Sequence, residues 1–129
     1  GKCWRLADGA VETLQVLGTR GYRLAVLSNN DSRLRPVLRD LGVSGLFEEL
    51  FISSEIGFEK PSQEIFQEVE RVLGTTPKDM FHLGDSYSRD VQGALSAGWR
   101  TALYSGKECK LPEDVSRIER FRELLDLLP

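Results

Sequence analysis

Short apolar runs alternate along the chain with longer stretches in which apolar residues recur every three or four positions. The short runs are typical of buried strands, and the longer stretches are typical of amphipathic helices. We predict strands at residues 22–28, 50–53, 80–83 and 100–104. Because a helical stretch separates each pair of strands, the pattern predicts an α/β domain with a mostly parallel sheet. Right-handed crossovers place the strand at 50–53 beside that at 22–28, and the strand at 100–104 beside that at 80–83.

The predicted helices have recognisable starts and ends. Candidate capping residues precede the first three helices, and glycines that can adopt a left-handed conformation end the first four. The caps are Asp8, Asp31 and Ser62, and the glycines are Gly21, Gly42, Gly74 and Gly98. The third helix carries an apolar stripe of Ile65, Phe66, Val69, Val72 and Leu73. The fourth runs from about Ser88 to Ala97, and a last amphipathic helix is predicted from Val115 to Leu128.

Composition narrows the class of protein. A chain of 129 residues, 40% hydrophobic and 29% charged, fits one globular domain. It has neither a long apolar run nor a charged and then apolar amino terminus, so we expect a soluble cytoplasmic protein with no membrane partner. The net charge of −3, with both signs interleaved, argues against a nucleic-acid partner. We interpret Cys3 and Cys109 as reduced structural thiols, because neither has a neighbour that suggests a metal site.

Polar residues gather where the predicted strands end. Ser28 and Asn29 follow the first strand, and Lys60 lies in the loop after the second. The carboxyl ends of parallel strands form the ligand-binding edge of such a sheet. A hydroxyl, backbone N–H groups and an ammonium at that edge could bind a phosphoryl group. Taken singly, Ser28 and Asn29 are better explained as turn formers, and Lys60 as a solvated surface residue.

The segment after the third strand carries two carboxylates. Asp85 follows Gly84 directly, and Asp90 lies near the start of the next helix, so both can face one crevice. Hard oxygen ligands of this kind suit Mg²⁺. A turn role for Asp85 and a dipole role for Asp90 are the alternatives. His82, the only histidine, lies inside a predicted strand, and we expect it to be packed or hydrogen-bonded rather than an acid or base.

The order of these signatures resembles the haloacid dehalogenase-like (HAD) hydrolases, and the phosphatase-like members in particular. The resemblance rests on Ser28-Asn29, Lys60-Pro61, Gly84-Asp85 and Asp90, each placed after a predicted strand. It implies a three-layer α/β/α Rossmann-like fold with Ser28 and Lys60 as catalytic residues. It further implies phosphate binding by Ser28, Asn29 and Lys60. Asp85 would be a direct Mg²⁺ ligand, and Asp90 a ligand or a residue that orients the ligands.

One family motif is missing from the chain. The family's nucleophile is an Asp in an Asp-x-Asp motif on the first, central strand, and no Asp-x-Asp occurs in these 129 residues. We therefore interpret residues 1–129 as a single partial core domain that lacks this strand and the cap. Residues 1–8, with Cys3-Trp4-Arg5-Leu6, would be a remnant of the connection from cap to core.

The missing motif leaves two hypotheses for function. In the first, the chain is part of a Mg²⁺-dependent phosphohydrolase that acts on a small phosphorylated metabolite through an aspartyl phosphate. The nucleophile would then come from a complementing amino-terminal segment or from a second chain, as in a homo-oligomer. In the second, the chain is a catalytically inactive truncated module or pseudoenzyme that binds phosphate-bearing ligands or a protein partner.

Overall fold

The computed structural model describes residues 6–129, which divide into two compact units. Unit 1 contains residues 6–55 and Arg120–Pro129, and unit 2 contains Ile56–Glu119. Cys3, Trp4 and Arg5, part of the expected cap connection, lie outside the described residues. Helices in the described part of the chain are too short or too polar to cross a bilayer.

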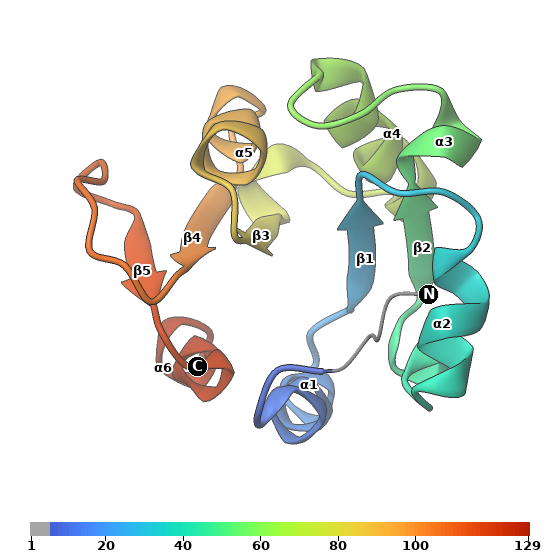
Figure 1. The fold of residues 1–129 in the computed structure, drawn as a ribbon. Helices are drawn as coiled ribbons and strands as arrows, with labels where there is room; N and C mark the ends of the chain where they lie inside the picture. Colours follow the sequence, from blue (N-terminus) through green and yellow to red (C-terminus); the bar gives the residue numbers. More distant parts are fainter. Residues whose placement is uncertain (1–5) are drawn as a thin grey trace. The chain divides into compact units, whose positions relative to one another are not determined.

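Unit 1 is built on a parallel pair of strands. β1 (Ala25–Ser28) pairs with β2 (Glu49–Ile52), and the register places Ser28 beside Ile52 (Figure 1). This pairing was expected from the right-handed crossover between the two strands. The strand expected at 22–28 is shorter and less buried than predicted: β1 is exposed or partly buried along its length, whereas Phe51 and Ile52 of β2 are buried.

The helices of unit 1 begin at different residues from those expected. α1 (Ala10–Thr19) starts after Gly9, whose φ of 75° is left-handed, so Asp8 is not its cap. α2 (Leu34–Asp40) starts after Arg33; the Asp31 carboxylate instead accepts a hydrogen bond from the Arg33 backbone N–H at 2.9 Å. Short polar side chains often bond to the backbone two residues ahead, and this local turn competes with helix capping.

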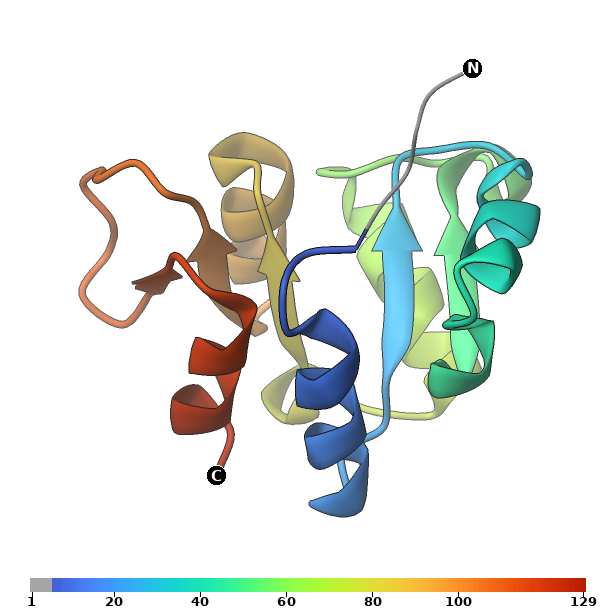
Figure 2. The same cartoon turned by 60° about the horizontal axis from the view of Figure 1, so that its bottom comes forward.

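Short elements complete unit 1. They are the 3₁₀ turns Ser44–Leu46 and Phe121–Glu123, and the helices α3 (Ser53–Ile56), which follows β2 directly, and α6 (Leu124–Leu127). α6 lies beside α1 although the two are far apart in sequence (Figure 2). Arg20 joins them, because its Nη1 donates hydrogen bonds to the backbone carbonyls of Leu125 and Leu128, each at 2.9 Å.

Unit 2 contains a three-stranded parallel sheet. β4 (Arg100–Tyr104) lies between β3 (Phe81–Gly84) and β5 (Ser116–Ile118). The bounds of β4 and its pairing with β3 confirm the prediction. The single helix expected at 115–128 is wrong, since this stretch forms β5, a 3₁₀ turn and α6. Its apolar spacing fits a helix, but Ser116–Ile118 forms backbone hydrogen bonds with β4, a tertiary interaction that overrides local periodicity.

The helices of unit 2 cover this sheet. α4 (Gln63–Leu73) ends at left-handed Gly74 as predicted, and buries Ile65, Phe66 and Val69, whereas Val72 is 43% exposed. Ser62 occupies the cap position, but its Oγ is buried and makes no hydrogen bond within residues 6–129. The helix expected at 88–97 begins instead as a π-helical turn (Tyr87–Val91), and continues as α5 (Gln92–Ser96). A 3₁₀ turn (Pro77–Asp79) precedes β3.

Candidate functional site

A buried carboxylate forms the centre of a polar cluster in unit 2. Asp90 is 2% exposed, and its Oδ1 lies 2.5 Å from Lys60 Nζ and 2.8 Å from His82 Nε2. Its Oδ2 accepts a hydrogen bond from the backbone N–H of Ser86 at 3.0 Å. The cluster therefore joins three segments of unit 2: the loop before α4, strand β3 and the turn after it.

The turn after β3 explains how Asp90 reaches this position. The Ser86 carbonyl accepts from the Val91 N–H, five residues further on, at 3.3 Å as well as from the Asp90 N–H at 2.9 Å, and the Ser86 hydroxyl accepts from the Arg89 N–H at 3.2 Å. The wider π-helical turn that results directs the Asp90 side chain back toward the end of β3. π-helical turns often occur at functional sites, where they reposition a side chain.

The environment of Asp90 keeps its carboxylate charged. Burial raises the pKa of a carboxyl group, but the hydrogen bonds from His82 and Lys60 outweigh burial and hold the pKa of Asp90 well below its ordinary value. A buried ion pair is stable only when the remaining donors and acceptors are also satisfied. Three donors meet this requirement for Asp90.

Asp85 occupies a different environment on the same turn. It follows Gly84 at the end of β3 and is exposed, and its carboxylate has no hydrogen bond or ion pair within residues 6–129. A carboxylate at the mouth of a loop, open to water, suits Mg²⁺, which retains several water ligands when it binds proteins. Within this part of the chain, no three His, Cys, Asp or Glu side chains converge as a ready-made metal site. Asp85 therefore fits a Mg²⁺ ion as one ligand of a shell that needs further oxygen atoms.

Ser28 and Asn29 belong to unit 1. Ser28 is the last residue of β1 and Asn29 follows it, and both are partly buried. The next residue, Asn30, ties the end of β1 to the start of α3: its N–H donates to Ser53 Oγ, and Ser53 Oγ donates to its carbonyl, each at 3.0 Å. These bonds hold the backbone after Ser28 in place, and the sequence assigned no role to Asn30 or Ser53.

The cluster brings together residues that the sequence treated separately. Lys60 and Asp90 were predicted on different grounds, and the structure places them in direct contact. His82 is packed and hydrogen-bonded, as expected, but its partner was not foreseen. The sequence signal that could have indicated this contact is the position of the only histidine, in a strand that leads directly to Gly84 and Asp85.

This chain is similar to haloacid dehalogenase-like hydrolases. Residues 2–98 match the family model for haloacid dehalogenase-like hydrolases. Human haloacid dehalogenase-like hydrolase domain-containing protein 3 is 37% identical, over 98% of this chain and 51% of the human protein. The glyceraldehyde 3-phosphate phosphatase of Methanopyrus kandleri is also 37% identical, over 92% of this chain and 54% of that protein.

Solved structures show the same similarity. A HAD phosphatase from Thermococcus onnurineus superposes with a TM-score of 0.89 at 25% identity, covering 96% of this chain and 58% of its own. YfnB from Bacillus subtilis, bound to magnesium, superposes with a TM-score of 0.86 at 29% identity, covering 96% of this chain and 56% of its own. The chain thus spans about half the length of the curated relatives it matches.

Proposed function

Because this chain belongs to the haloacid dehalogenase-like hydrolases, we propose that it supplies part of the core of a Mg²⁺-dependent phosphohydrolase that acts on a small phosphorylated metabolite. The observation that carries the proposal is the buried Lys60–Asp90 ion pair, together with the exposed carboxylate of Asp85 at the start of the turn that carries Asp90. An oriented ammonium and an open carboxylate are suited to a phosphoryl group and the cation that accompanies it.

Each residue has a distinct role in the proposal. Lys60 offsets the negative charge of the phosphoryl group, and Asp90 holds its ammonium. Ser28 and Asn29 bind phosphoryl oxygen atoms through a hydroxyl and through the N–H groups after β1. Asp85 would hold Mg²⁺, and Asp90 would orient that loop; the cation, when bound, supplies further positive charge to the phosphoryl oxygens.

The covalent step requires a nucleophile that these 129 residues do not contain. An aspartate carboxylate from a complementing segment or a second chain would attack phosphorus in line, and the bond to the leaving alkoxide would break. Water would then hydrolyse the aspartyl phosphate and release inorganic phosphate. The glyceraldehyde 3-phosphate phosphatases among the relatives support a small sugar-phosphate-like substrate.

The residues of this chain taken alone also fit a second candidate function, since they include no Asp-x-Asp motif. Without a nucleophile, Lys60, Asp85 and Asp90 can position a phosphate but cannot form the covalent intermediate. In this alternative the chain is a non-catalytic module that binds phosphate-bearing ligands or a protein partner.

Complementation distinguishes the two candidates. The chain would be mixed with the part of the human relative that it does not cover, and p-nitrophenyl phosphate hydrolysis would be measured with Mg²⁺. We expect no turnover by the chain alone and measurable turnover by the mixture. Lys60→Ala should abolish this turnover, whereas Lys78→Ala, on the exposed turn before β3, should leave it unchanged. A mixture that assembles without hydrolysing the ester would favour the binding module.

A further inference from the structure

His82 lies in β3 with its ring buried beside the charged cluster. The residue is 8% exposed, and its backbone carbonyl accepts a hydrogen bond from Thr101 Oγ1 at 2.7 Å, in addition to the ladder with β4. Its position along the strand is therefore well anchored. The direction of its ring nitrogens then depends on the side chains around it.

Two aromatic rings hold the imidazole in one orientation. Phe66 contacts it edge to face, with ring centroids 6.0 Å apart and an interplanar angle of 89°, and Trp99 does so at 6.3 Å and 72°. Trp99 is itself held, since its Nε1 donates to Glu70 at 2.7 Å. Such packing leaves the ring little freedom to rotate, so Nε2 remains directed at Asp90.

Asp90 Oδ1 is shared by two donors. Lys60 Nζ and His82 Nε2 both contact this one oxygen, at 2.5 Å and 2.8 Å. An ionised carboxylate can only accept hydrogen bonds, so the hydrogen between His82 and Asp90 must be carried by Nε2. Without that donor, the carboxylate is held by the Ser86 N–H and the Lys60 ammonium, so it is oriented less firmly and holds the ammonium less firmly in turn.

We propose that His82 is a positioning residue: its Nε2–H orients the Asp90 carboxylate, and Asp90 in turn fixes the ammonium of Lys60. The importance of this arrangement for phosphate rests on the proposed function. The positioning of Lys60 by His82 and Asp90 does not rest on the proposed function, because it consists of contacts within unit 2 and can be tested without phosphate, metal or turnover.

The first test concerns the ring hydrogen. The chain contains one histidine, so a long-range ¹⁵N–¹H spectrum of the full chain reports on His82 alone. We expect a hydrogen on Nε2, whether the ring is neutral or charged. A neutral ring with its hydrogen on Nδ1 would overturn the proposal, because Nε2 could not then donate to Asp90.

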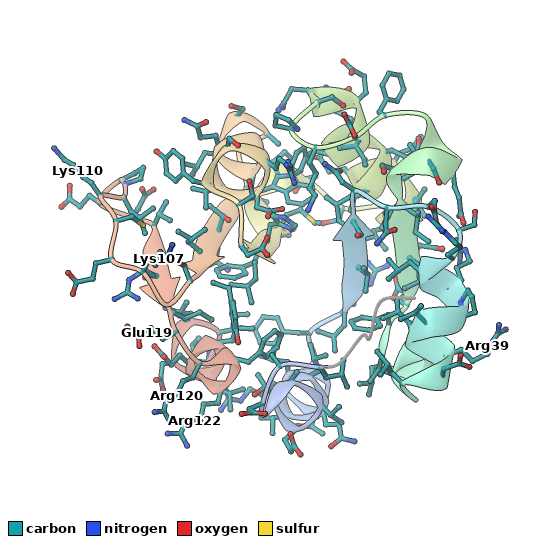
Figure 3. All side chains as sticks on the ribbon, viewed as in Figure 1. Arg39, Lys107, Lys110, Glu119, Arg120 and Arg122 are labelled. Atoms are coloured by element: carbon teal, nitrogen blue, oxygen red, sulfur yellow. The ribbon has the colours of Figure 1, made fainter. Side chains whose placement is uncertain are left out.

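The second test measures whether His82 holds Lys60. Trace acetylation of the folded chain, read by mass spectrometry, would compare Lys60 with Lys107 and Lys110, which extend into solvent from the loop between β4 and β5 (Figure 3). The Lys60 side chain is 11% exposed, so its reaction should be slow. We expect acetylation of Lys60 to rise about tenfold in His82→Phe, which keeps an aromatic ring but loses the N–H; this factor corresponds to losing a hydrogen bond to a charged group.

His82→Gln and Asp90→Asn are the matched variants. Glutamine can place an N–H donor near the former Nε2 position, so it should restore most of the slow reaction, whereas Asp90→Asn should accelerate it. Circular dichroism would establish that each variant is folded, and should His82→Phe fail to fold, the ring hydrogen and His82→Gln decide the result. Two results would overturn the proposal. One is acetylation of Lys60 at the wild-type rate in folded His82→Phe, and the other is acetylation that is as fast in His82→Gln as in Asp90→Asn.

Discussion

Gly84 and Asp90 approach so closely that a Cβ atom on Gly84 would lie 2.0 Å from Cγ of Asp90. No real Cβ occupies such a position, so the turn after β3 can direct Asp90 back over the strand end only if residue 84 has no side chain. Lys60 and His82 converge on the oxygen of that same carboxylate. The glycine before Asp85 therefore serves the buried ion pair as well as the turn.

Gly84→Ala should destabilise the protein strongly. The new methyl group would displace a buried carboxylate from its donors, and we expect a loss of about 3 kcal/mol in the free energy of unfolding, measured with urea. Gly106→Ala is the matched control, since a Cβ at Gly106 would meet no atom within 4 Å and its backbone needs no left-handed conformation. Equal stability of the two variants would contradict the close approach.

The Asp90 carboxylate should make stability depend on acid pH. Its pKa is lower in the folded protein than the ordinary 3.8, so below that pH the unfolded chain binds a proton that the folded chain does not. The stabilisation from this carboxylate is fully present at pH values well above 3.8, and it is lost progressively as the pH falls from there through the pKa of the folded state. Urea unfolding from about pH 5 to about pH 2 should show a falling free energy of unfolding, with a smaller slope in Asp90→Asn. The same slope in Asp90→Asn would assign the acid sensitivity to other carboxylates.

Mg²⁺ should bind this chain weakly and through Asp85. Asp85 is the open carboxylate of the turn, whereas the oxygens of Asp90 already accept three hydrogen bonds. In calorimetric titrations, Asp85→Asn should weaken binding by about tenfold or more, since losing even an outer partner of a metal site has an effect of that size. Asp79→Asn, on the exposed turn before β3, should bind as the wild type does. Unchanged binding in Asp85→Asn would remove Asp85 from the site.

Arg20→Ala should loosen the carboxy-terminal segment of unit 1. Arg20 Nη1 donates to the carbonyls of Leu125 and Leu128, which have no partner further along α6, and we expect a loss of about 1 to 2 kcal/mol in the free energy of unfolding. Amide hydrogen exchange at residues 120–129 should accelerate. Arg39→Ala, at the exposed end of α2 (Figure 3), should change the free energy of unfolding by less than about 0.5 kcal/mol. Unaltered exchange in Arg20→Ala would show that these two hydrogen bonds do not hold α6.

The sequence by itself determined the class of fold and the order of β1 to β4, and it singled out the candidate residues of the site. The apolar run at 100–104 is a strand with those bounds, and the crossovers predicted both the β1–β2 and the β3–β4 pairs. These features depend on periodicity and on chain direction, which neighbouring residues already express. Ser28, Lys60, Asp85 and Asp90 could be singled out because each lies at the end of a strand or in the loop or turn after one.

The tertiary structure decided the features that depend on residues distant in sequence. Residues 116–118 became β5 because β4 offered them backbone partners, although their apolar spacing fits a helix. Ser62 makes no cap bond, and Asp31 bonds within its own turn. Residue type alone does not reveal which of several competing hydrogen bonds such a side chain forms. The convergence of Lys60 and His82 on one oxygen of Asp90 required α4, β3 and the π-helical turn to pack together. A charge network of this kind has no local signature, since its partners lie up to 30 residues apart and are joined by folding alone.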